Sequence, residues 1–249
     1  AAYAQRVLAD GSLVPGWPTN GVRIVLNRYI RELLSDGAGG AYLACGTAGQ
    51  SGDDDYFLQR FTGSGAIAPG WPAGGAVVCQ APDIRFALRM VPDGAGGVLL
   101  AWYDYRDFSD DEIFLLRMRE DGTRFPGWPA DGLRVTDNTL LDSIENLAPD
   151  GMGGAYLSWD RYLGPSVGDR LALHHLTGTG ALSPGWAANG VLVPSDAQVS
   201  YGPLVADGMG GAIVAWTRGG DHNIRALRLG PDGPVAVLIS LVSAEAEVG

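Results

Sequence analysis

The chain has 249 residues, with 17 basic and 28 acidic side chains and a formal net charge of −11. This acidic balance repels phosphate backbones and excludes nucleic acid as a natural partner. Hydrophobic residues make up 46% of the sequence and charged residues 18%, which excludes a disordered protein, and no apolar run is long enough for membrane insertion.

Two short phrases alternate along the chain. Asp-Gly-x-Gly-Gly occurs four times, each copy 57 residues after the one before, at Asp36, Asp93, Asp150 and Asp207. Pro-Gly-Trp precedes each copy once, at Pro15, Pro69, Pro126 and Pro184. A fixed period of this size is typical of one supersecondary unit that buries its apolar face by stacking on its neighbours.

Short apolar runs predict the secondary structure. The chain opens with two strand-sized segments, Tyr3–Leu8 and Val22–Leu26. A complete repeat then has four such runs, which in its second copy are Phe86–Pro92, Val98–Trp102, Ile113–Met118 and Leu133–Thr136. Runs of this length bounded by Gly, Pro and Asp predict β-strands, and no stretch has helical periodicity.

Four short antiparallel strands per repeat predict an all-β fold, a β-propeller. We name the strands of one blade A to D, with Asp-Gly-x-Gly-Gly as the A–B turn. The chain then holds four complete blades and half of another, in a five-bladed or larger ring. The expected units are residues 1–27, 28–80, 81–137, 138–195 and 196–241. Residues 242–249 are expected to be a linker towards a downstream domain.

One segment carries a resemblance to a known group of repeats. Residues 207–216 read Asp-Gly-Met-Gly-Gly-Ala-Ile-Val-Ala-Trp, and residues 3–6 read Tyr-Ala-Gln-Arg. Together they resemble the repeats of large secreted bacterial proteins, which are predicted propellers and largely uncharacterised. The resemblance implies a bacterial protein of modular build, located outside the cell or on its surface.

Comparison of the blades separates repeated positions from variable ones. All seven tryptophans fall at repeated positions, so we expect them to pack between blades rather than to bind a ligand. One strand-C position holds a cation or histidine in every unit, and its residues are Arg6, Arg60, Arg117, His175 and Arg228. Beside a fixed Asp, these residues predict a structural ion pair, because buried charges need partners.

The two cysteines are expected to have a structural role. Cys45 stands where later repeats have tryptophan, and Cys79 lies elsewhere in the unit. We expect both to be reduced core residues, since buried cysteine behaves as a small hydrophobe. A disulfide is the alternative.

The loops between strands B and C vary in length, whereas the A–B turns do not. A rigid scaffold with variable loops on one face is typical of a binding surface. The candidate ligand-binding residues on this loop face are Asp104, Tyr105, Arg106, Asp160 and Tyr162. Acidic residues in the same loops are weak calcium candidates, namely Asp53, Asp54, Asp55, Asp110 and Asp111. Their spacing matches no regular calcium loop, so we expect no metal and no cofactor, with calcium as the alternative.

Catalytic signals in the sequence are poor. The chain has three histidines and neither a CxxC nor an HExxH motif, so we expect no enzyme and no catalytic residues. The leading hypothesis is a non-catalytic scaffold or binding module, with a protein or a glycan as its partner. One alternative is a glycan-binding or glycan-processing propeller. Another is a structural subunit of an extracellular assembly, in which a neighbouring chain or an upstream segment completes the open first blade.

Overall fold

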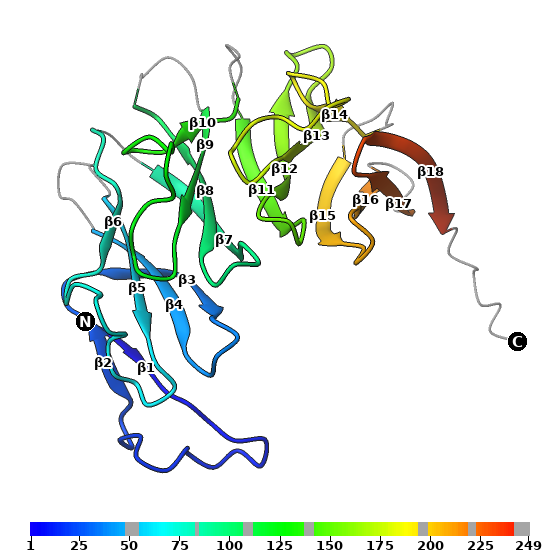
Figure 1. The fold of residues 1–249 in the computed structure, drawn as a ribbon. Helices are drawn as coiled ribbons and strands as arrows, with labels where there is room; N and C mark the ends of the chain where they lie inside the picture. Colours follow the sequence, from blue (N-terminus) through cyan, green and yellow to red (C-terminus); the bar gives the residue numbers. More distant parts are fainter. Residues whose placement is uncertain are drawn as a thin grey trace, which may run out of the picture.

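The computed structural model describes residues 1–47, 55–82, 85–106, 112–136, 142–193, 199–218 and 223–241. All regular structure in these ranges is β-strand, so they contain no helix of a length and hydropathy that would cross a membrane. The strands form five antiparallel sheets that follow one another along an arc (Figure 1). The prediction of an all-β propeller with four complete blades and half of another is confirmed.

The strands pair in chain order within each sheet. The half-blade has β1 (Ala2–Ala4) and β2 (Val22–Val25). Blade 1 has β3 (Tyr29–Ser35), β4 (Ala41–Gly46), β5 (Tyr56–Phe61) and β6 (Ala76–Cys79). Blade 2 has β7 (Arg85–Pro92), β8 (Val98–Asp104), β9 (Glu112–Met118) and β10 (Leu133–Arg134). Blade 3 has β11 (Asp142–Pro149), β12 (Ala155–Tyr162), β13 (Asp169–Leu176) and β14 (Val191–Leu192). Blade 4 has β15 (Val199–Ala206), β16 (Ala212–Arg218), β17 (Ile224–Gly230) and β18 (Gly233–Leu241).

The first strand is shorter than the sequence predicts. β1 ends at Ala4, and beyond it Val7 makes only an isolated bridge to Leu13. The same bridge recurs in blades 1 to 3, but there it is made by the last residue of strand C, for example between Met118 and Arg124. Strand C of those blades pairs with strand B along its length, whereas β1 pairs with β2 alone among the described residues, so it ends earlier. The expected linker, residues 242–249, lies outside the described residues.

The Asp-Gly-x-Gly-Gly phrase closes the turn between strands A and B. In blade 2, Asp93 Oδ1 accepts the N–H groups of Ala95 and Gly97, each at 2.8 Å. A Cβ on Gly97 would lie 2.2 Å from the carbonyl oxygen of Met118. The last glycine of the phrase is therefore required because strand C passes directly against it.

Blades stack through their inner strands and their tryptophans. The A strands β3, β7, β11 and β15 contact one another in succession. Trp102, in blade 2, is fully buried, and its ring meets Tyr56 of blade 1 edge-on, with 6.2 Å between the ring centroids. All seven tryptophans are buried, which confirms the expectation that they belong to the core. Cys45 and Cys79 are buried and free, as expected.

The cation position of strand C also links blades. Arg60 binds Asp36 of its own A–B turn at 3.0 Å and the Glu120 carboxylate of blade 2 at 2.9 Å. The indole N–H of Trp71 donates to the Glu120 carbonyl oxygen at 3.0 Å. In blade 3, His175 takes the place of the arginine and contacts Asp150 at 3.1 Å. The predicted structural ion pair is confirmed for the arginines of blades 1, 2 and 4, and Arg6 of the half-blade has no such Asp beside it among the described residues.

Candidate functional site

Each inner strand is broken by a β-bulge. The register shifts lie between Ile30 and Glu32, Phe86 and Arg89, Ile144 and Asn146, and Tyr201 and Leu204. In β7 the bulge includes Ala87, whose φ of 48° is rare for a residue with a side chain. Bulges redirect side chains and are frequent beside active sites, and strained backbone clusters there as well. The bulged inner strands are therefore the best candidates for the position of a functional site.

The bulges are fixed by the neighbouring blade. Arg89 Nε donates to the main-chain oxygen of Glu145 at 3.0 Å. Asn146 Nδ2 donates in the same way to Gly202 at 3.1 Å. Arg89 and Asn146 each lie four residues before the A–B turn of their own blade. A polar side chain four residues before the A–B turn thus bonds the main chain at the bulge of the next blade. In blade 3 this contact fixes the backbone that carries the Glu145 side chain.

Two carboxylates lie close together at the bulge of blade 3. Glu145 is in β11, and Asp160 of β12 pairs with Ser143, two residues before Glu145. Burial raises the pKa of Glu145, the negative charge of Asp160 raises it further, and the positive charge of Arg89 opposes both. A carboxyl group with a raised pKa beside a second carboxylate is the arrangement that separates an acid from a base in glycoside hydrolysis.

A second carboxyl group with a raised pKa lies two blades away. Glu32, in β3, is half-buried, and burial is the main cause that raises its pKa. The charge of Arg89 and the Met90 N–H lower it in part. Arg89 therefore acts electrostatically on Glu32 and on Glu145, from a position on the blade between them.

Three aromatic rings gather on blade 2. Phe86 stacks on Tyr103 with 5.3 Å between ring centroids, and Tyr105 meets both rings at 6.0 Å. The Phe86 residue is 41% exposed. Phe86 belongs to β7, which packs against β11, the strand of Glu145. We call Phe86, Tyr103 and Tyr105 the aromatic cluster; its open face offers an apolar surface that begins on a strand in contact with the strand of Glu145.

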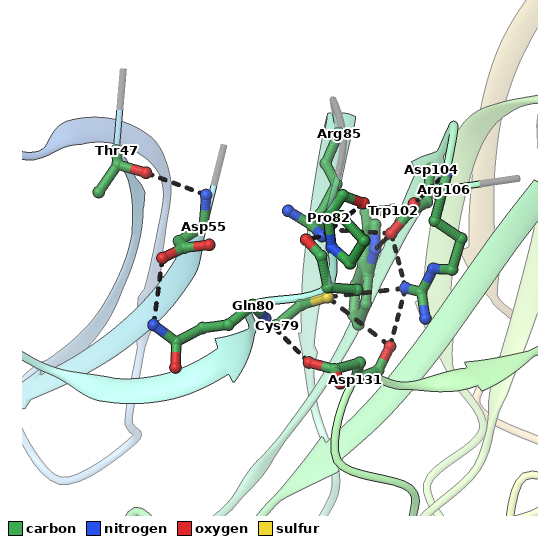
Figure 2. A network of polar contacts seen from close by, with 11 residues as sticks. Thr47, Asp55, Cys79, Gln80, Pro82, Arg85, Trp102, Asp104, Arg106 and Asp131 are labelled. Atoms are coloured by element: carbon green, nitrogen blue, oxygen red, sulfur yellow. Dashed lines mark hydrogen bonds and ion pairs between the residues drawn. The ribbon is translucent and has the colours of Figure 1, made fainter. Parts of the chain in front are cut away.

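Two of the predicted ligand-binding residues are held in a network that Figure 2 shows in detail. Asp104 is buried, and its Oδ2 accepts hydrogen bonds from Arg85 Nε at 3.0 Å, Arg106 Nη2 at 2.6 Å and Trp102 Nε1 at 3.2 Å. Arg106 also donates to the Asp131 carbonyl oxygen at 2.9 Å. Asp104 and Arg106 thus stabilise the end of blade 2 through these contacts, which is a structural role.

The five predicted residues thus fall into two groups on neighbouring blades. Asp104 is the last residue of β8 in blade 2, Tyr105 and Arg106 follow it, and Tyr105 joins the aromatic cluster. Asp160 and Tyr162 belong to β12 of blade 3, where Asp160 lies beside Glu145 and Tyr162 pairs with Asp169. One member of each group, Tyr105 and Asp160, therefore reaches the inner-strand site.

Of the calcium candidates, only Asp55 is among the described residues; Asp53, Asp54, Asp110 and Asp111 lie outside them. The Asp55 N–H donates to Thr47 Oγ1 at 3.0 Å, and its Oδ2 accepts from Gln80 Nε2 at 3.1 Å. In the part of the chain that the structure describes, no group of three His, Cys, Asp or Glu side chains could hold a metal ion.

A cleft of about 610 Å³ lies by the A–B and C–D turns of blades 1 and 2. Arg60, Glu120 and Phe125 are among the residues that line it. Its Arg60 and Glu120 already pair with each other and link the blades. We therefore place the candidate site at the inner-strand bulges instead of in this cleft.

Reasoning from the sequence missed Phe86, Arg89 and Glu145, because it looked at the loops and not at the inner strands. A signal was present. The first three repeats place charged or amide side chains four or five residues before the Asp-Gly turn, in otherwise apolar runs. The fourth repeat has Gly202 and Pro203 there.

Several solved structures share the fold. An endo-arabinase from Bacteroides thetaiotaomicron is 12% identical with a TM-score of 0.46, over 88% of this chain and 80% of its own. A family 43 glycoside hydrolase from Bacillus licheniformis is 15% identical with a TM-score of 0.45, over 87% and 60%. A GH93 α-L-arabinofuranosidase of Fusarium graminearum, solved with arabinobiose, is 11% identical with a TM-score of 0.42, over 88% and 67%. No protein-family model and no curated protein sequence matches the chain.

These structures correct one expectation from the sequence. We expected a non-catalytic scaffold and no enzyme. Each of the three structures is of a glycan-processing enzyme, which stands against that expectation and agrees with the alternative, a glycan-processing propeller. The carboxylates at the bulge of blade 3 come from two different strands, so no local motif marks them in the sequence.

Proposed function

We propose that this chain is a glycan-processing propeller whose site is formed by Glu145, Asp160 and the aromatic cluster. The observation that carries the proposal is the carboxylate pair. The pKa of Glu145 is raised by burial and by the charge of Asp160, on a bulge that Arg89 of the preceding blade holds in place. Perturbed carboxyl groups that are fixed from two sides are typical of catalytic acids.

Glu145 serves as the general acid in this proposal. Its carboxyl group gives a proton to the glycosidic oxygen as the bond from the anomeric carbon to that oxygen breaks. Asp160, as an ionised carboxylate, stabilises the positive charge that develops on the sugar ring and takes a proton from the attacking water. The products are two shorter sugars, and the water supplies the new hydroxyl group of one of them. The enzyme is restored when Asp160 releases the proton of the water to solvent and Glu145 takes up a proton from solvent.

The aromatic cluster binds the sugar in this proposal. Sugar rings have an apolar face of C–H groups that packs on aromatic rings, and ligand sites combine such rings with a few polar groups. Phe86 offers the exposed ring, and Tyr103 and Tyr105 support it. Phe86 on β7 and Glu145 on β11 belong to contacting strands, so a bound chain of sugars would reach from the rings to the carboxylates.

A glycan array and a hydrolase screen test the proposal together. The screen would measure reducing ends released from a panel that includes arabinan and xylan, by the natural chain and by Glu145→Gln. The control is Glu120→Gln, which removes an exposed carboxylate by the other face. We expect sugar release by the natural chain and the control, and a loss of at least about 100-fold in Glu145→Gln. Glycan binding without any release would reduce the proposal to a binding module, and neither binding nor release would refute it.

We further propose that the protein works outside the cell or on its surface. The support is the resemblance of residues 3–6 and 207–216 to repeats of secreted bacterial proteins. An antibody against the chain, applied to culture medium and to intact cells of the source organism, tests this location. Detection only after lysis would contradict it.

A further inference from the structure

The half-blade leaves one strand edge open. In every complete blade, strand C pairs with strand B on one side and with strand D on the other. β1 is the strand C of the half-blade and pairs with β2 alone among the described residues. Its other edge has the unpaired N–H and C=O groups that accept a further strand.

The inner strand of blade 1 shows what normally covers this place. Leu33 in β3 lies three residues before the A–B turn and is 58% exposed. Its equivalents in the next three blades are only 3%, 9% and 6% exposed, and they are Met90, Leu147 and Leu204. The preceding blade buries the residue in those three cases, since β11, for example, contacts β7, β8 and β9. Leu33 is exposed because the half-blade has no strand A or B among the residues that the structure describes.

The charge of Arg6 indicates which kind of group would fit at the open edge. The equivalent cation in each complete blade contacts the Asp of its own A–B turn, as Arg117 does with Asp93 at 2.9 Å. Arg6 keeps the link to the next blade, through Gly63, at 3.0 Å. Among the residues that the structure describes, no carboxylate takes the place of that Asp beside Arg6. The open position is therefore complementary to an acidic turn.

A groove of about 480 Å³ joins these features. Its lining includes Tyr3, Arg6, Trp17, Ile30 and Leu33. We propose that this groove binds a β-hairpin of one further repeat, with its Asp-Gly-x-Gly-Gly turn against Arg6. Its strand B adds to the free edge of β1, its strand A covers Leu33 and Ile30, and its Asp pairs with Arg6.

The four complete blades argue for this occupant. They supply four copies of the same arrangement in one chain, and in each the partner of strand C is a hairpin with an Asp at its turn. Many partners could cover the apolar side chains Leu33 and Ile30. Arg6 has no carboxylate partner in the half-blade, however, so it favours an occupant with an acidic turn. The proposal does not depend on the glycan site, which lies on blades 2 and 3.

A fusion tests the proposal. A copy of residues 85–104, the A–B hairpin of blade 2, is joined ahead of Ala1 through eight Gly and Ser residues, close to the natural B–C distance. We expect the melting temperature to rise by about 4 °C or more and the amides of β1 to exchange at least about tenfold more slowly. The same hairpin added as a separate peptide should slow the same amides.

Matched variants separate a specific fit from general apolar cover. Asp→Asn at the turn of the added copy should remove about half of the increase in melting temperature. Arg6→Gln should remove a similar share of it. The two changes together should remove no more than either alone, because both break the same ion pair. The proposal is wrong if the hairpin changes neither the melting temperature nor the exchange of β1, or if the Asn copy acts equally well. It is also wrong if light scattering shows a dimer of the natural chain whose β1 amides are already protected, since the occupant would then be a second copy.

Discussion

Arg117 and Gly178 join two blades: Nη1 of Arg117 donates to the Gly178 carbonyl oxygen at 3.1 Å across the boundary. The same guanidinium binds Asp93 of its own A–B turn through Nε at 2.9 Å. One side chain therefore fixes the turn and the next blade together. In blade 4 the matching pair is Arg228 and Asp207, and the Arg228 side chain is 41% exposed.

This difference predicts unequal effects of the same substitution. Arg117→Gln leaves the buried Asp93 without its charge partner, and we expect a loss of about 3–5 kcal/mol in the free energy of unfolding. Arg228→Gln removes a more exposed cation, and we expect less than half of that loss. Denaturant unfolding of the two variants measures both. Equal losses would show that the link to the next blade contributes nothing.

Trp128 tests the packing between blades. Its ring is buried, and a Cβ on Gly180 of the next blade would lie 2.9 Å from it. We expect Trp128→Ala to lower the free energy of unfolding by about 3–5 kcal/mol, because the ring fills the space between blades. Gly180→Ala should also destabilise the protein, by collision with the ring. Unchanged stability of Trp128→Ala would overturn this account of the tryptophans.

Phe86 tests the aromatic cluster. Phe86→Ala should weaken glycan binding about tenfold or more, because it removes the exposed ring that the proposed site offers to the sugar. Its folding stability should change little, because the ring is partly in solvent. Binding and unfolding are measured on the same preparation. A variant that binds glycan as tightly as the natural chain would exclude the cluster from the site.

His174 predicts how stability depends on pH. Burial is the main cause that lowers its pKa from the ordinary value of 6.5 to about 4, and its Nε2 lies 3.1 Å from the Ala187 carbonyl oxygen. Between pH 6.5 and 4 the unfolded chain binds a proton at this residue and the folded chain does not. Stability should therefore fall as the pH falls through that window, by up to about 3 kcal/mol.

A variant isolates this contribution from that of the carboxylates. His174→Gln does not titrate, so the difference in unfolding free energy between it and the natural chain should shrink from pH 7 to pH 4. The matched measurement is urea unfolding at half-unit steps of pH. A constant difference would mean that His174 does not titrate in this way.

The repeat made much of the fold predictable. Glycine and Asp mark each A–B turn, and comparison of the repeats assigned the tryptophans and Arg117 to structural positions without any structure. The site was harder to predict because its contacts are not local. The sequence predicts Asp104 in a variable loop, yet it is the last residue of β8, where Arg85 and Arg106 bind it in a buried network.

The surroundings of Glu145 could not be predicted from the sequence for the same reason. In the sequence it is one acidic residue in a strand. Its pKa is raised by burial and by the charge of Asp160 on the next strand, and it is lowered in part by Arg89 of the preceding blade, which also holds the bulge. The approach of these three groups exists only once two blades have stacked, so no spacing in the chain announces it.

A double-mutant cycle on sugar release tests the catalytic pair most directly. The rates of the natural chain, Glu145→Gln, Asp160→Asn and the double variant are compared on the polysaccharide that the screen finds most readily cleaved, between pH 4 and 9. We predict that each single change costs at least about 100-fold, that the double change costs little more, and that the natural rate falls as the pH rises through the raised pKa of Glu145. Independent, additive losses, or variants as fast as the natural chain, would contradict the account.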